Sequence, residues 1–67
     1  MIVSTRNYIY ELRQGGAIVA TGHLARETPF KVGERVRFDE RAGIVQSVVP
    51  TLEPGVERVV IQLLRGG

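Results

Sequence analysis

Apolar and polar residues alternate near the start of the chain, where Tyr8, Tyr10 and Leu12 fall on one side of an extended backbone. A period of two in the apolar positions, together with aromatic and β-branched side chains, is typical of a half-buried β-strand. Gly15-Gly16 follows, and this dipeptide readily takes the positive φ angles of a two-residue hairpin turn. The pattern therefore predicts a first hairpin, whose second strand is Ala17–Gly22.

The alternation stops between His23 and Pro29. Gly22 and Pro29 limit this segment to a length that is too short for an independent helix. We therefore expect a polar loop with Leu24 as its apolar anchor.

The middle of the chain predicts a second hairpin. Its first strand, Phe30–Phe38, alternates apolar residues with Arg35 and Arg37. Gly33 interrupts this strand and marks a turn or a close approach of the backbone. The segment Asp39–Gly43 is the expected turn, because Asp and Gly both favour turn conformations.

Two further strands, Ile44–Val49 and Arg58–Leu64, are apolar on both faces. Pro50 ends the first of them because proline has no N–H to donate to a strand ladder. The segment Glu53-Pro54-Gly55 predicts a turn, since proline presets φ and glycine supplies a left-handed position. Strands that are apolar on both faces are typical of a central position or of contact with a partner chain.

Five short strands separated by Gly, Pro and Asp turns predict an all-β fold, namely a five-stranded antiparallel small barrel that is closed or nearly closed. Closure removes the exposed strand edges that would otherwise promote aggregation. The 67 residues correspond to a single domain over residues 1–67, with a thin core.

Part of the central hairpin forms a family pattern within residues 30–49. The residues that carry it are Val32-Gly33-Glu34, Val36, Gly43, Val45 and Val48. This pattern resembles the Src-homology-3-like small barrels, particularly the KOW and Tudor-like versions. The resemblance implies an SH3-like barrel, a fold whose members bind RNA, proteins, peptides or modified side chains.

A second pattern, Phe30-x-x-Gly33-x-Arg35-Val36-Arg37, is similar to the opening of the plasmid-type dihydrofolate reductases, which are small tetrameric barrels. Those enzymes carry a Val-Gln-Ile-Tyr segment in the active site. This chain has Val60-Ile61-Gln62-Leu63 instead, without the tyrosine, so we do not expect that activity here.

The composition is that of a folded globular chain, with 43% hydrophobic and 24% charged residues. Eight arginines and one lysine contribute to a net charge of +2. An arginine bias has two alternative explanations, namely an anionic partner or a GC-rich coding sequence. The sequence has no long apolar run, no signal-peptide pattern and no cysteine, so we expect a cytoplasmic protein without a membrane segment.

Catalysis is not expected from this set of residues. His23 is the only histidine, cysteine is absent, and Ser4 and Ser47 lack an evident base. A nucleophile, a base and an orienting group therefore cannot be assembled, and one histidine without thiolates does not make a typical zinc site. We expect a protein that is not an enzyme and that uses no cofactor, metal ion or small-molecule ligand.

A basic patch is the first candidate site. Arg35 and Arg37 project from one face of the predicted third strand, with Arg41 in the next turn and Lys31 before the strand. Such a patch is able to hold the phosphates of RNA or DNA. The alternative is a solvated or salt-bridged face, because the neighbouring acidic residues include Glu34, Asp39 and Glu40.

An apolar stripe is the second candidate site. Only one face of each strand can point into a thin barrel, so we expect Val45, Val49, Val60 and Leu64 to lie outside. An exposed stripe of this kind usually marks an interface. Its occupant is either a second copy of the chain, which makes a homo-oligomer, or another protein.

The sequence leaves three functions open. The first is a non-catalytic binding or assembly module that acts through protein contacts, and the second is binding of RNA or DNA through the arginine face. The third is a ubiquitin-like or sulfur-carrier protein, because Gly66-Gly67 resembles the conjugated tail of that class. The missing helix of the β-grasp fold argues against this third function.

Overall fold

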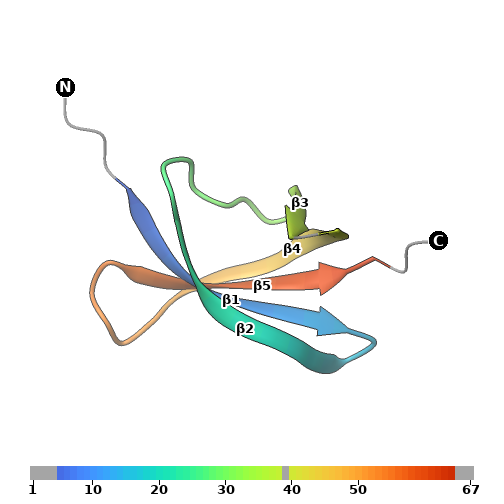
Figure 1. Cartoon of the computed structure of the whole chain (residues 1–67). Helices are drawn as coiled ribbons and strands as arrows, with labels where there is room; N and C mark the ends of the chain where they lie inside the picture. Colours follow the sequence, from blue (N-terminus) through green and yellow to red (C-terminus); the bar gives the residue numbers. More distant parts are fainter. Residues whose placement is uncertain (1–4, 39, 65–67) are drawn as a thin grey trace.

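Five β-strands and their connections make up the computed structural model, which describes residues 5–38 and 40–64 (Figure 1). No helix occurs in this part of the chain, so the prediction of an all-β fold is confirmed. The strands are β1 (Arg6–Gln14), β2 (Ala17–Arg26), β3 (Arg35–Phe38), β4 (Arg41–Pro50) and β5 (Val56–Leu63).

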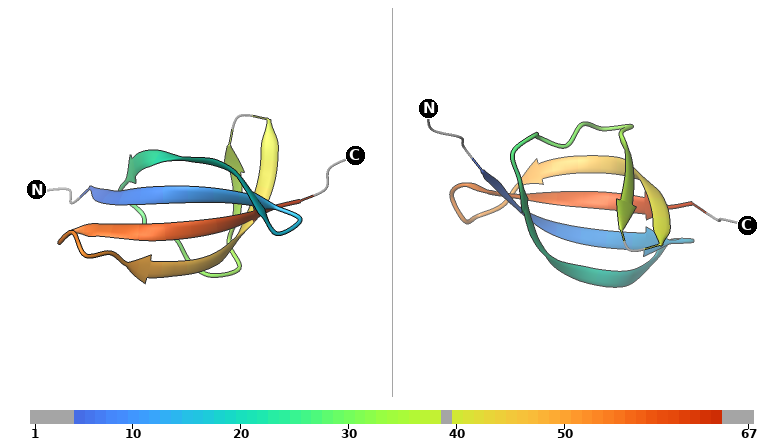
Figure 2. Two further views of the ribbon diagram at one scale, coloured as in Figure 1. Left: turned by 90° about the horizontal axis from the view of Figure 1, so that it is seen from below. Right: turned by 45° about the horizontal axis from the view of Figure 1, so that its top comes forward.

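The strands form one curled sheet in the order β2-β1-β5-β4-β3 (Figure 2). Three neighbouring pairs are antiparallel, but β1 and β5 are parallel, so the prediction of an entirely antiparallel barrel was wrong. The reason is geometric. Each strand reverses the direction of the one before it, so the first and the fifth run the same way and can pair only in parallel.

The curled sheet is open between β2 and β3. No Cα atom of β2 lies within 8 Å of a Cα atom of β3, whereas paired strands lie about 4.8 Å apart. We call this gap the open side. It makes the structure a half-barrel in which β2 and β3 are the two edge strands (Figure 2).

The first hairpin has the predicted two-residue turn. Gly15 and Gly16 have φ angles of 59° and 88°, and the flanking residues Gln14 and Ala17 are paired. Positive φ at both turn positions matches the right-handed twist of the strands. The turn confirms the prediction made from the Gly-Gly dipeptide.

Strand β2 is longer than the sequence predicts, because it continues through His23 to Arg26. The expected polar loop was wrong for these residues. Gly22 does not end the strand but lies against the ring of Tyr10, where a Cβ atom would come within 2.5 Å of the tyrosine hydroxyl. Glycine at this position therefore makes room for the ring of Tyr10 and does not form a turn.

The core lies on the concave face of the sheet. Its buried members are Tyr8, Leu12, Phe30, Val45, Val59, Ile61 and Leu63. The side chain of Val45 is only 1% exposed. The expectation that Val45 lies on the outer surface is therefore corrected, since it packs inside the half-barrel.

Candidate functional site

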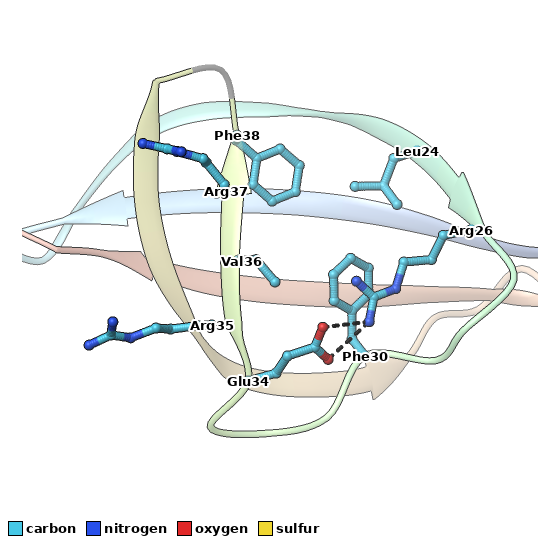
Figure 3. Close-up of a pocket in the computed structure, with 8 residues that line it drawn as sticks. All are labelled: Leu24, Arg26, Phe30, Glu34, Arg35, Val36, Arg37 and Phe38. Atoms are coloured by element: carbon cyan, nitrogen blue, oxygen red, sulfur yellow. Dashed lines mark hydrogen bonds and ion pairs between the residues drawn. The ribbon is translucent and has the colours of Figure 1, made fainter.

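The open side contains a pocket of about 370 Å³ between the two edge strands (Figure 3). Strand β2 and the connection 27–34 form one wall, and β3 forms the other. The lining residues are Leu24, Arg26, Phe30, Glu34, Arg35, Val36, Arg37 and Phe38. This pocket joins apolar side chains from the concave face to charged side chains at the rim.

Phe30 fills the end of the open side where the chain crosses from β2 to β3. Its side chain is 7% exposed, and its ring meets the ring of Tyr8 edge-on, with centroids 4.7 Å apart. The backbone N–H of Phe30 also donates to the Tyr8 hydroxyl at 3.3 Å. The side chain of Phe30 thus anchors the connection 27–34 in the core, between the end of β2 and the start of β3. We call this side chain the wedge.

Arg26 covers this wedge. Its guanidinium carbon lies 3.6 Å from the centroid of the Phe30 ring, which is a cation–π geometry. The Nη2 atom donates to both carboxylate oxygens of Glu34, at 2.9 and 2.8 Å, and to the carbonyl of Pro29 at 3.1 Å. The guanidinium of Arg26 therefore binds groups of its own chain and helps to shape the pocket.

Glu34 fixes the start of β3 to the end of β2. Its carboxylate accepts the bonds from Arg26 and a further bond, at 3.0 Å, from the backbone N–H of Lys31. The hydrogen bonds from Arg26 are the main cause of a lowered pKa at Glu34, the Lys31 amide acts in the same direction, and partial burial opposes them. Glu34 is therefore held as a carboxylate.

The apolar walls of the pocket come from inward-facing residues of the edge strands. Leu24, Val36 and Phe38 are half-buried and pack against the core. The ring of Phe38 lies 5.1 Å from that of Tyr10, at an interplanar angle of 34°. Because no strand covers these side chains on the side that faces the gap, part of their apolar surface remains accessible to solvent.

Arg35 and Arg37 lie on the outer face of β3 and point away from Val36 and Phe38 (Figure 3). Both are exposed, and neither forms an ion pair within residues 5–38 and 40–64. Arg41 pairs with Phe38 across the β3–β4 hairpin, and Arg37 and Arg41 line one surface pocket together with Glu40. The structure thus brings Arg35 and Arg37 of the predicted patch together on β3 and places Arg41 near Arg37 at the end of the hairpin.

Lys31, the fourth residue of the predicted patch, is exposed in the connection 27–34. It precedes the turn at Gly33, whose φ is 90°. The backbone N–H of Gly33 donates to the carbonyl of Val45 at 2.8 Å, so the turn leads directly onto β4. Lys31 therefore lies on a different element from the arginines of β3.

The predicted apolar stripe does not form one patch. Val49 and Leu64 are exposed, Val60 faces outward but is covered by its neighbours, and Val45 belongs to the core. Val49 is paired with Arg58, six residues before Leu64 along β5, which corresponds to about 20 Å along a strand. The two exposed members are therefore too far apart to share a small contact.

The structure describes only some of the residues that the sequence analysis considered for catalysis or for a carrier function. His23 is exposed on β2, opposite Ile9. The described residues hold no group of three or more His, Asp or Glu side chains that could bind a metal ion. Ser4 and Gly66-Gly67 lie outside the described residues.

In the part of the chain that the structure covers, no helix is long and apolar enough to cross a bilayer.

Sequence reasoning missed the joint role of Arg26 and Glu34. The sequence analysis placed Arg26 in a loop and therefore outside any strand. The alternation of inward and outward side chains continues after Gly22, with Leu24 and Arg26 facing inward and His23 facing outward. This alternation is the sequence signal that could have placed Arg26 on the inner face.

Comparison with family models, with curated proteins and with solved structures gives no match.

Proposed function

We propose that this chain is a non-catalytic binding module of the SH3-like small-barrel type, which acts through contacts with protein. The observation that carries this proposal is the open side, where the edge strands β2 and β3 each have one side without a strand partner among the described residues. Unpaired backbone N–H and C=O groups on a strand edge are ready to pair with another chain.

The edge of β2 is only partly protected against such pairing. Natural edge strands are commonly short, carry lysine or proline, or contain bulges and inward-facing charges. Strand β2 has ten residues without lysine or proline, and its protection is limited to a register shift opposite Leu12 and Arg13 and to Arg26 at its end. Ile18 and Val19, on the same strand, are 57% and 43% exposed. A long, apolar and uncovered edge is better explained by a protein partner than by solvent alone.

The local structure of the central hairpin supports the SH3-like assignment as a proposal. The Val32-Gly33-Glu34 step turns the chain into β3, and the backbone N–H of Val45 donates to the carbonyl of Glu34 at 2.9 Å. In this arrangement the turn at Gly33 precedes the valine-containing strand β3 and its hairpin with β4, which is the order of elements in the SH3-like pattern. Such folds host many functions, so the protein-binding role depends on the open side rather than on the fold.

Two measurements on the whole chain test the protein-binding role. Light scattering gives the oligomeric state across micromolar concentrations, and a displayed library of random peptides shows whether any sequence is selectively retained. The proposal expects either reversible self-association or an enriched peptide family. A strict monomer that enriches no peptide above an unrelated small β protein would overturn it.

Binding of RNA or DNA is a second candidate, favoured by the exposed pair Arg35 and Arg37 on one face of β3. The aromatic residues do not assist, because Tyr8 and Phe30 are buried, and Tyr10 and Phe38 pack against the core. Contact would therefore be with phosphates, without stacking on bases. Fluorescence anisotropy with duplex and single-stranded probes should show weak binding that falls steeply with salt. No binding at low salt would exclude this function.

A further inference from the structure

We propose that the open side binds an extended acidic peptide segment of a partner protein, which adds a strand along the edge of β2 and faces β3. This inference rests on the proposed protein-binding function and names the class of partner. It draws on three independent features of the open side, namely its unpaired strand edge, its apolar floor and the charge of its rim.

The edge of β2 that faces the gap is free to pair with one more strand. Adjacent strands of a sheet lie about 4.8 Å apart. The Cα atoms of β2 and β3 are nowhere closer than 8 Å, and both strands are edges of the sheet. A peptide in the gap can therefore form backbone hydrogen bonds with β2, as in other cases of β-strand addition.

The floor of the gap selects apolar side chains at alternate positions of the peptide. Successive residues of a strand point to opposite faces, so every second side chain of an added strand would enter the pocket. There it would meet Leu24, Val36 and Phe38, which are half-buried. The wedge of Phe30 under Arg26 closes the end of this floor and limits its length.

The rim of the gap selects acidic side chains at the remaining positions. Side chains of an added strand that point outward would lie on the same face as Arg35 and Arg37, which have no ion-pair partner within the described residues. Glu34, the nearest acidic residue before β3, is already bound to Arg26. A carboxylate from the partner would thus meet two guanidinium groups that form no ion pair within the described residues.

A second copy of this chain fits the rim poorly. The edge strands available for pairing in a second copy are β2 and β3, and neither contains an acidic residue. Pairing between two copies would instead bring additional arginines, Arg26 or Arg35 and Arg37, toward the same gap. Charge complementarity therefore favours a different protein as the partner.

A blocked, fluorescein-labelled peptide of about eight residues that alternates Val and Glu is the probe. The expected result is saturable anisotropy with the whole chain and a loss of affinity of about tenfold in the double variant R35E/R37E. The same variant should gain affinity for a matched Val/Lys peptide. R58E, an exposed charge reversal on the outer face of β5, is the control and should bind the Val/Glu peptide like the unmodified chain.

Strand pairing is tested with a Val/Glu peptide that is N-methylated at alternate residues, because this change removes N–H donors and keeps the side chains. The methylated peptide should not bind. Equal binding of the methylated peptide, or equal losses in R35E/R37E and R58E, would overturn the inference. Failure of the Val/Glu peptide alongside binding of library-selected peptides would overturn it and leave the binding module intact. Absence of any peptide binding in a strict monomer would overturn both.

Discussion

The central carbon of the Arg26 guanidinium lies 3.6 Å from the centroid of the Phe30 ring. The same guanidinium holds the carboxylate of Glu34 with two hydrogen bonds, and Phe30 rests edge-on against Tyr8. These contacts join the end of β2 to the start of β3 through side chains instead of a strand ladder. They set the shape of the open side, on which the proposed function depends.

Replacement of Phe30 by Ala tests the wedge. Loss of a buried phenyl ring costs about 3–5 kcal/mol, which is a large part of the roughly 3–10 kcal/mol expected for a chain of this size. Urea unfolding should show this loss, with F30L intermediate. V32A, at an exposed position of the same connection, should change the free energy of unfolding by less than about 0.5 kcal/mol. Equal effects of F30A and V32A would contradict the wedge.

Replacement of Glu34 by Gln tests the ion pair through its pH dependence. The pKa of Glu34 is lowered in the folded state, so its contribution to stability is present above its ordinary value of 4.5 and is lost as the pH falls through the lowered folded pKa. Since both side chains are partly exposed, the variant should lose about 0.5–1 kcal/mol at neutral pH. Urea unfolding at several pH values should show this difference shrinking in acid. A difference that grows in acid would contradict the assignment.

Replacement of Gly22 by Ala tests the close approach of Tyr10. A Cβ atom at this position would lie 2.5–2.7 Å from three atoms of the tyrosine side chain, so we expect a loss of about 1–3 kcal/mol through overpacking. The added methyl group should cost much less in a Y10A background, because the obstructing ring is absent. A double-mutant cycle measured by thermal unfolding gives this coupling. Additive effects would show that the two residues do not collide.

Local sequence patterns predicted most of the strands but not how they combine. Alternation around Tyr8 and the Gly-Gly turn define the first hairpin, as the structure confirms. The parallel pairing of β1 with β5 and the gap between β2 and β3 depend on contacts between distant segments, about which alternation carries no information. Gly22 was a misleading stop signal, since its role is to admit the ring of Tyr10.

The position of Val45 shows a second limit of the pattern. Strict alternation places Val45 and Val49 on one face, but a register shift between Val45 and Ser47 interrupts the β4–β5 pairing. An extra residue in one strand changes which side chains face inward beyond it. Val45 therefore packs in the core while Val49 is exposed. Both faces of this strand are apolar, so the sequence gives no sign of the shift.

The open side itself is tested most directly by amide hydrogen exchange, measured by NMR on the whole chain at a concentration where light scattering gives a monomer. The fold predicts alternating protection along β2, because amides that face β1 are bonded and those that face the gap are not. The central strands β1 and β5 should be protected at nearly every residue. Continuous protection along β2 in the monomer would show that this edge is covered, and would contradict both the open side and the binding role built on it.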